Sequence, residues 1–528
     1  MEMEIRQERQ GEVLTFYLTG ELNKLTAEAF DREFATQGAK DVRLDFSGLE
    51  YLSSAGLRSI LQAAKTVEME GGQFAVLYPQ EAVLEVFEMT NFDRFIHIVK
   101  AGEKPQEVSR EYYPLRPIQR WLTDTHFHRA KSTMMNNGGL ARLEPGVDME
   151  RLAEAVNGVL NAHDIFRCRL VFHPETGELC QRFDGEVERV VVESLSEEAF
   201  EERRQELKHP YGLIDRPLYR IHIIETPTGK YIYMDFYHAI MDGMAIVMLF
   251  WRELDKRYVH GNESVDAKRK QSSYADYIRE EASISEEEKE KGRAYWRAAL
   301  AGFDTSRHLP PMDGGNSEDG LEHELETPLQ GIEKDFFKGK DFTENTFFMG
   351  AAMLAIAKAA GVRESIMSWV HNGRVTPAER RLMGLMLDQF PLRWDFSEDM
   401  AVSEFLPRLE AKVAEGMQYR KGLDAIYEED LEGSCATFIL QKGTMGRRGG
   451  VKLGDTQAVI EDLPANEISA AENILDIELN AHDDGAYALV LSYDIERYSR
   501  QSMKNYAKIV QDMILAMQDG EKKLSELL

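Results

Sequence analysis

The sequence contains little cysteine and no long apolar run. Its three cysteines, Cys168, Cys180 and Cys435, show no metal-ligand spacing, and their odd number argues against a disulfide framework. We therefore predict no metal site. The opening residues, MEMEIRQERQ, lack the apolar core of a signal peptide, and no apolar run reaches the length of a membrane span. These absences favour a soluble protein in the reducing cytoplasm.

Basic residues are scarce relative to acidic ones. The chain has 63 lysine and arginine residues against 92 aspartate and glutamate residues, and its net charge is −29. Such a protein repels the phosphate backbone of DNA and RNA, so we expect no nucleic-acid partner. A hydrophobic content of 43% is typical of a folded protein, and 528 residues exceed the size at which one core stops growing. We expect two or more domains.

The first hundred residues have the pattern of a small α/β domain. Strand-like segments at 13–22, 41–48 and 73–79 alternate with helix-like segments at 26–35 and 53–72. Alternation of this kind is typical of a sheet with helices packed on it.

Two polar stretches, 100–114 and 305–324, divide the rest of the chain. The residues beyond the first stretch are numerous enough for a larger α/β domain with two lobes. We predict a small domain at 1–102, a linker at 103–111, and lobes at 112–302 and 303–528.

The segment LDFSGLEYLSSAGLRSIL, Leu44 to Leu61, leads from a strand into a helix that begins near Ser53. Taken alone, a serine in this position is most simply a helix cap. The region from Met3 to Val99 resembles STAS domains, the bacterial anti-sigma-factor antagonists. The residues that carry this resemblance are Asp45, Ser47, Tyr51, Leu52, Ser53, Ser54, Gly56 and Leu57. The resemblance implies that Ser54 is a phosphoacceptor and that the partner is an anti-sigma factor or a serine kinase.

A second informative segment is FYHAIMDG, Phe236 to Gly243, which follows a strand-like run. If that strand ends near His238, the side chain lies at its end, where a site can form, and an imidazole can accept a proton near neutral pH. Asp242 could orient that imidazole or pair with a distant cation, and Gly243 permits a backbone angle or a close approach. On spacing alone, a histidine beside an acid is more often structural than functional.

The surrounding chain, from about Tyr112 to Leu528, resembles the condensation domains of nonribosomal peptide synthetases, in the chloramphenicol-acetyltransferase-like superfamily. The matching segments follow the family's order: YPLRPIQRWL, LNAHDIFRCRLV, YGLIDRPLYRIHII, FYHAIMDG, SSYADYIREE, GRAYWRAALAG, WVHNGR and MGLMLDQFPLRWDF. The resemblance implies that His238 is catalytic and that Asp242 forms a buried ion pair with Arg374. Gly243 would supply room or a backbone donor at the reacting centre.

The resemblance also implies a reaction and its substrates. An acyl thioester on a phosphopantetheine arm or on coenzyme A would transfer its acyl group to an amine or an alcohol. No cofactor would be bound permanently. Because we find no adenylation or carrier domain, an acyl or peptidyl carrier protein would act in trans. The two-lobed members of the family complete their tunnel within one chain, so we expect a monomer.

The sequence departs from the condensation pattern at three places. Tyr237 stands where the family has its first motif histidine, and Asp388 and Gln389 stand where it often has Asn-Thr. The segment at 418–429 only faintly resembles a late family motif.

These departures leave three hypotheses open. The chain is an acyltransferase whose STAS module docks or regulates it, or it is a non-enzymatic signalling protein whose large domain senses a ligand. In the third hypothesis, the STAS-like unit is only a scaffold, and Ser54 is an unmodified cap.

Overall fold

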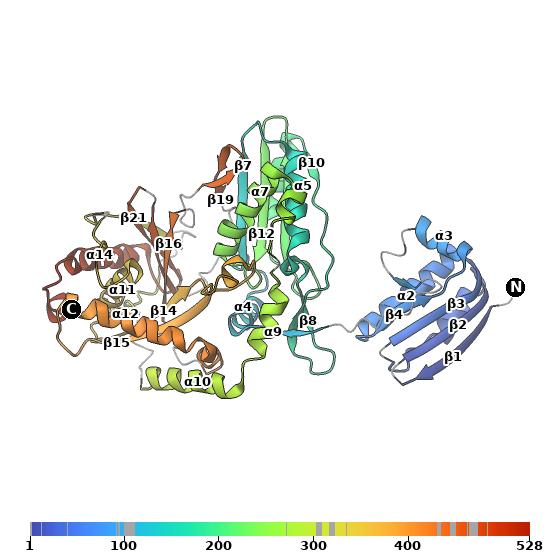
Figure 1. The fold of residues 1–528 in the computed structure, drawn as a ribbon, viewed down its shortest axis with the longest axis horizontal. Coiled ribbons are helices and arrows are strands. Elements are labelled where there is room, and N and C mark those ends of the chain that lie inside the picture. Colours follow the sequence, from blue (N-terminus) through green and yellow to red (C-terminus); the bar gives the residue numbers. More distant parts are fainter. Residues whose placement is uncertain are drawn as a thin grey trace. The chain divides into compact units, whose positions relative to one another are not determined.

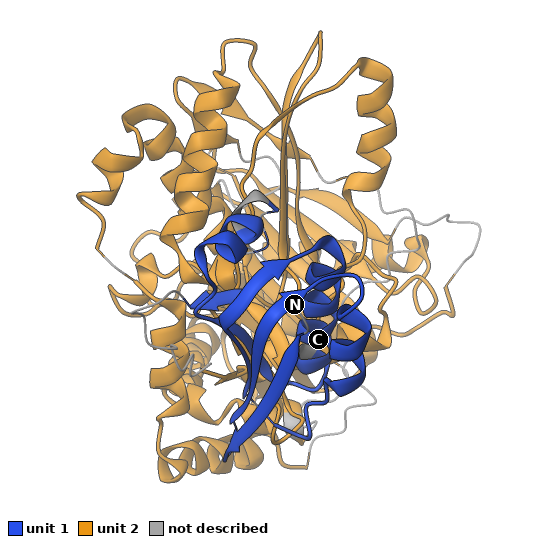
Figure 2. Ribbon diagram, turned by 90° about the vertical axis from the view of Figure 1, so that its right-hand side faces the viewer, with its two compact units in different colours: residues 1–110 blue, residues 111–528 orange. Residues whose placement is uncertain are grey.

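The computed structural model describes most of the chain. The described residues are 3–11, 13–39, 41–90, 92, 96–99, 111–270, 272–302, 309–315, 323–333, 335–429, 435–443, 450–461, 463, 474–482 and 484–528. The chain divides into two compact units, residues 1–110 and residues 111–528 (Figure 2).

The small unit is a sheet with helices packed on it. Its strands lie in the order β1-β2-β3-β4-β5, with β1 antiparallel to β2 and the other pairs parallel. The strands are β1 Glu4–Gln10, β2 Val13–Leu22, β3 Asp41–Leu52, β4 Gln73–Leu77 and β5 His97–Val99. The helices are α1 Ala27–Glu33, α2 Ser54–Met69 and α3 Glu81–Met89. In β2 the buried residues Leu14, Phe16 and Leu18 alternate with more exposed ones, which directs one face of the strand into the core.

The large unit contains a first sheet with strand order β10-β11-β12-β7-β19. Its strands are β7 Asn136–Leu143, β10 Val192–Ser194, β11 Tyr219–Glu225, β12 Lys230–Tyr237 and β19 Ile460–Glu461. Helices α5 and α7 lie beside this sheet (Figure 1). The helices of this part of the chain are α4 Pro117–His128, α5 Met149–Ala162, α6 Glu197–Leu207 and α7 Trp251–His260. A smaller sheet joins β6 Tyr113–Pro114, β9 Leu179–Arg182 and β8 Arg169–Phe172.

A second sheet of the large unit has the order β13-β21-β20-β16-β14-β15. Its strands are β13 Glu324–Leu329, β14 Glu364–His371, β15 Asp388–Asp395, β16 Ala436–Lys442, β20 Leu475–Ala481 and β21 Tyr487–Tyr493. The helices packed with it include α11 Glu344–Ala360, α12 Val402–Gln418 and α14 Arg500–Met517 (Figure 1). Helix α11 is buried from Thr346 to Ala357, as expected for a helix that is apolar on all sides.

The large unit has further described elements. They include α8 Asn262–Asp266, α9 Tyr274–Ala282, α10 Glu286–Leu300, α13 Asp424–Glu428, α15 Leu524–Leu527, and the hairpin of β17 Val451–Leu453 and β18 Thr456–Ala458. Strand β19 follows this hairpin and pairs with β7, so the chain returns from the second sheet to the first. Among the described helices, none has both the length and the hydropathy that a bilayer crossing requires.

Candidate active site

His238 directly follows strand β12, at the end of the first sheet. The strand is hydrogen-bonded to β11 on one side and β7 on the other, and it ends at Tyr237. The backbone N–H of His238 then donates to the carbonyl of Met135 at 2.9 Å, and that of Ile240 donates to the carbonyl of Tyr237 at 2.9 Å. A tight turn therefore presents His238 directly after a central, rigid strand.

The imidazole of His238 has one ring nitrogen engaged. Its Nδ1 lies 3.2 Å from the carbonyl oxygen of Met241. A carbonyl oxygen can only accept, so in the neutral form of the ring Nδ1 carries the proton and Nε2 carries the lone pair. Among the described residues, Nε2 has no hydrogen-bond partner, and the side chain is half-buried. This arrangement leaves a nitrogen that can accept a proton.

Asp242 holds the loop that carries His238. Its Oδ1 accepts the backbone N–H of Ala245 at 2.7 Å, and its Oδ2 accepts the N–H of Met386 at 2.7 Å. The same Oδ2 lies 2.9 Å from Nη1 of Arg374, and both side chains are buried. The carboxylate thus connects the turn after β12 to a segment that lies between β14 and β15.

Arg374 extends this connection through its remaining donors. Nη2 donates to the carbonyl of Gly384 at 2.8 Å and to that of Leu382 at 3.3 Å, and Nη1 also donates to the carbonyl of Asn372 at 3.1 Å. Charged donors shared among one carboxylate and several carbonyls fix the path of a loop. The expected partners Asp242 and Arg374 are therefore in contact, whereas neither contacts the imidazole through a described hydrogen bond.

Gly243 follows Asp242 at the start of a helical segment. It is absent from the glycines with a left-handed backbone, so its φ angle does not require glycine. The next residues, Ala245–Phe250, form a π-helix that continues into α7. Short π-helical turns occur often at functional sites.

Tyr237 is directed away from solvent into the core of the first sheet. It is fully buried, and its ring lies 5.4 Å from the ring of His126 and 5.6 Å from that of Tyr211. Burial lowers the pKa of His126, although a backbone hydrogen bond at Tyr211 partly opposes this, so its surroundings favour the neutral ring. Tyr237 is thus a packing residue in this structure.

In the small unit, Ser53 and Ser54 have different environments. The hydroxyl of Ser53 accepts the N–H of Gly56 at 3.3 Å, so Ser53 caps α2. Ser54 is the exposed first residue of α2, and Tyr51 beside it is 52% exposed. A Cβ on Gly56 would lie 2.6 Å from the carbonyl oxygen of Leu22, so only glycine permits this close approach of helix and strand.

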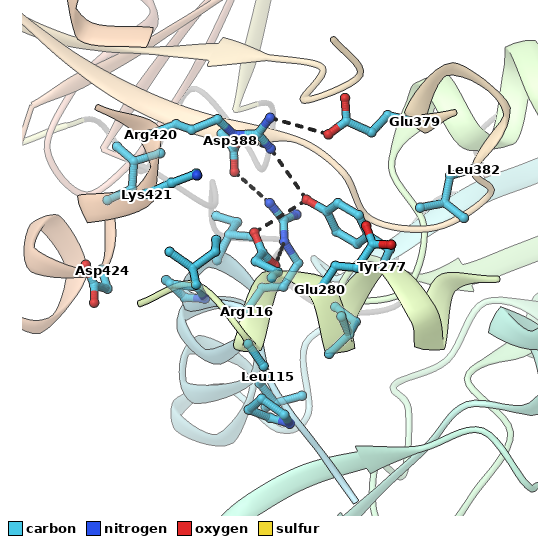
Figure 3. Close-up of a pocket in the computed structure, with 18 of the residues that line it drawn as sticks. Leu115, Arg116, Tyr277, Glu280, Glu379, Leu382, Asp388, Arg420, Lys421 and Asp424 are labelled. Atoms are coloured by element: carbon cyan, nitrogen blue, oxygen red, sulfur yellow. Dashed lines mark hydrogen bonds and ion pairs between the residues drawn. The ribbon is translucent and has the colours of Figure 1, made fainter. Parts of the chain in front are cut away.

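Sequence reasoning missed an ionic network beside a cavity. Arg116 Nη2 lies 2.8 Å from Asp388 Oδ1, and Arg420 Nη2 lies 3.1 Å from Asp388 Oδ2 (Figure 3). Arg116 Nε also donates to Glu281 at 2.9 Å. The available signal was the arginine in YPLRPIQ together with the aspartate in MLDQF, two charged residues in otherwise apolar motif segments.

The family comparisons agree with the two units. The STAS domain family matches residues 4–104, and the Condensation domain family matches residues 109–528. The second match covers more than half of the sequence, so the chain belongs to the condensation-domain family and carries an N-terminal STAS domain. The predicted fold class, a small α/β domain followed by a larger α/β condensation domain, is confirmed.

The similar curated proteins are much longer than this chain. Tyrocidine synthase 3 of Brevibacillus parabrevis is 24% identical over 310 residues, which are 56% of this chain and 5% of that protein. Surfactin synthase subunit 2 of Bacillus subtilis (strain 168) is 21% identical over 442 residues, 80% of this chain and 12% of that protein. The chain therefore spans a small part of these relatives.

Solved structures share the fold of the large unit. The condensation domain of the monacolin K polyketide synthase MokA has a TM-score of 0.63 at 18% identity, and covers 78% of this chain and 99% of its own. The epimerization domain of the third module of tyrocidine synthetase B has a TM-score of 0.59 at 18% identity, and the match covers 79% of this chain and 99% of that domain's chain. At these identities the likeness shows the fold.

Proposed function

We propose that this protein transfers an acyl group from a thioester to an amine or an alcohol, forming an amide or an ester. The donor would be an acyl chain on the phosphopantetheine arm of a carrier protein acting in trans, or on coenzyme A. The single observation that carries the proposal is the free Nε2 of His238, on a turn held by the Asp242–Arg374 ion pair.

In this mechanism, His238 is the general base. Its Nε2 takes the proton of the acceptor as the amine or alcohol attacks the thioester carbonyl, while Nδ1–H remains on the carbonyl of Met241. The tetrahedral intermediate then collapses, the C–S bond breaks, and the proton leaves with the thiol. Gly243 would leave space, or a backbone N–H, near the developing oxyanion.

The fold alone does not select this reaction. The structural neighbours include condensation domains, an epimerization domain and an X-domain solved in a complex with OxyB from teicoplanin biosynthesis. One fold therefore serves several roles, and the argument depends on the residues at the site.

The test compares the wild-type chain with His238→Ala. Acyl-CoA and acyl-carrier thioesters are offered with a panel of amines and alcohols, and the product is measured by mass spectrometry. We expect the rate to fall by about 10²–10⁴-fold, the usual contribution of a general base. His209→Ala, which removes an exposed histidine of the same unit, should leave the rate unchanged.

A second candidate function is ligand sensing without catalysis. It is favoured by one observation, the burial of Tyr237 where the family has a motif histidine. No product from the wild type above the enzyme-free background with every donor would contradict acyl transfer and support the sensor. Equal product from wild type and His238→Ala would contradict the role of His238.

For the small unit, we propose that Ser54 is the phosphoacceptor and that the STAS domain docks a kinase or an anti-sigma factor. The support is chemical: Ser54 is exposed, whereas Ser53 already serves as the cap. A phosphate on Ser54 would add about two negative charges at a helix N-terminus, which favours them.

The tryptic peptide Leu44–Arg58 allows a direct measurement. We expect tandem mass spectrometry of protein isolated from its own cells to find phosphate on Ser54. The proposal fails if the peptide is unmodified under all growth conditions, or if phosphate is found only on Ser47 or Ser53.

A further inference from the structure

A cavity of about 620 Å³ lies in the large unit, beside the start of α4. Its wall is built from α9, the start of α10, the segment 376–388 and the segment 420–427 (Figure 3). This volume is within the range of about 300–1,000 Å³ that small-molecule sites occupy. His238, Asp242 and Gly243 are not among the residues that line it.

One wall of the cavity is the ionic network centred on Asp388. Arg116 and Arg420 approach its carboxylate from opposite sides, and Figure 3 shows all three converging with Tyr277. The hydroxyl of Tyr277 accepts from Arg420 at 3.4 Å, and Glu379 lies 3.7 Å from the same guanidinium. The side chains of Arg116 and Asp388 are at most 9% exposed, so this wall is a built polar surface.

The sign of the charge on the wall differs from that of the whole protein. The cavity is lined by seven basic and six acidic side chains, whereas the chain has 63 basic and 92 acidic residues. A wall with more basic than acidic groups is therefore unusual for this protein.

The carboxylates of the wall are mostly neutralised already. Asp388 is shared by two arginines, Glu281 pairs with Arg116, and Asp424 pairs with Arg293 at 2.5 Å. Asp276 pairs with Arg279, which lies outside the cavity lining, and Glu379 accepts two backbone N–H groups in addition to Arg420.

Two basic groups of the wall remain without a carboxylate. Within the described part of the chain, the lining residues Lys289 and Arg381 have no ion-pair partner. Among the acidic lining residues, the exposed Glu280 has none either. Both basic residues line the cavity; Lys289 is half-buried and Arg381 is exposed. The unmatched charge of the wall is positive.

The uncharged part of the wall is mostly apolar, with three aliphatic hydroxyl side chains. Its larger apolar residues include Leu115, Ile118, Ile278, Leu382, Leu423 and Tyr427, and the aliphatic hydroxyls belong to Ser272, Ser273 and Thr376. An apolar surface with a few convergent charges is the composition that recognises a small amphipathic ligand.

We propose that this cavity binds a small amphipathic anion, an aliphatic carboxylate, with its carboxylate toward Lys289 and Arg381 and its chain against the aliphatic wall. The site is separate from His238, so the inference does not depend on acyl transfer. Binding would bridge α9 and α10 to the segments 376–388 and 420–427.

The test measures binding of octanoate to the full chain by isothermal titration calorimetry, with octan-1-ol and octylammonium as neutral and cationic probes of the same length. We expect octanoate to bind and the other two to bind more weakly. Lys289→Met with Arg381→Met should weaken octanoate by about 10–100-fold, as loss of charged hydrogen bonds does. Lys291→Met is the matched control, because Lys291 lies on the same helix, is exposed, and pairs with Glu287.

Three outcomes would overturn the proposal: no heat of binding with octanoate, octylammonium binding as tightly as octanoate, or equal weakening by the control variant. Equal melting temperatures of the variants and the wild type verify that each change is local. The measurement reports binding alone. If the protein binds octanoate but transfers no acyl group, the proposed function fails and this inference stands.

Discussion

Asp242 joins two segments that lie 132 positions apart in the chain. Its carboxylate accepts two backbone N–H groups and the guanidinium of Arg374, so both of its oxygens are used. The side chains of Asp242 and Arg374 are 4% and 3% exposed, and an ion pair with so little water depends on its partners for solvation. His238 is held by this residue through the loop that they share.

Replacing Asp242 with asparagine should therefore destabilise the large unit. The change leaves Arg374 buried without a carboxylate, and we expect the free energy of unfolding to fall by about 3–5 kcal/mol. Unfolding in guanidinium chloride, followed by tryptophan fluorescence, measures this free energy. In the control Asp276→Asn, the lost partner Arg279 is exposed, so the loss of stability should be small. Equal losses in the two variants would show that the ion pair of Asp242 is unimportant.

At this scale the sequence reveals some contacts and hides others. Asp242 and Arg374 could be named together because each lies in a segment that resembles a family motif. The contact of Arg116 with Asp388 spans 272 positions, and no local period relates the two residues. Such pairs form only once the folded chain has placed their segments together, so a single sequence does not predict them.

Among the elements, α7 is fixed to its neighbours by a cluster of charges. Arg257 on α7 is fully buried and contacts Glu253 on the same helix and Asp266 on α8. Glu253 also lies 2.9 Å from His163, the C-cap of α5. Burial alone would raise the pKa of Glu253, but its contacts with His163 and Arg257 outweigh it and lower the pKa to about 2. The carboxylate thus stabilises the packing of α5 against α7.

We predict that Glu253→Gln lowers the free energy of unfolding by about 2–4 kcal/mol at pH 7. The folded-state pKa lies below the ordinary value of 4.5, so the stabilisation is present above pH 4.5 and is lost as the pH falls toward 2. Urea unfolding at several pH values should show the difference from wild type shrinking below pH 4.5. Glu287→Gln, at an exposed pair, serves as the control. If the difference in unfolding free energy between wild type and Glu253→Gln did not change with pH, the lowered pKa of Glu253 would not be the source of the stabilisation.

Elements could be predicted where their pattern is long and regular. The strand before His238 was expected from its residues, and β12 ends at Tyr237. Strand β19 could not be found in this way, because Ile460–Glu461 is too short to have a period and is a strand only through its pairing with β7.

At the scale of the whole molecule, the two units have separate hydrophobic cores. The core of the small unit is formed by residues between Leu14 and Ile96, and the cores of the large unit contain only residues from Tyr113 onward. A unit with its own core can in principle fold alone. The division into domains could be predicted from a single sequence. Chain length and the alternation of strand-like and helix-like segments are both read directly from the sequence and need no knowledge of long-range contacts.

We therefore predict that residues 1–110 and 111–528, produced separately, each unfold within about 2 °C of the corresponding transition in the full chain. The small unit is the sensitive one. If the other unit contributed 1 kcal/mol to its stability, the melting temperature of a domain of about 100 residues would change by roughly 4–8 °C. Differential scanning calorimetry of the three proteins measures this, and the full chain should show two transitions. Phosphorylation of Ser54 would then act on the large unit through a partner rather than through its stability. A larger shift in either fragment would instead reveal a stabilising contact between the units and make direct regulation by the STAS domain the better explanation.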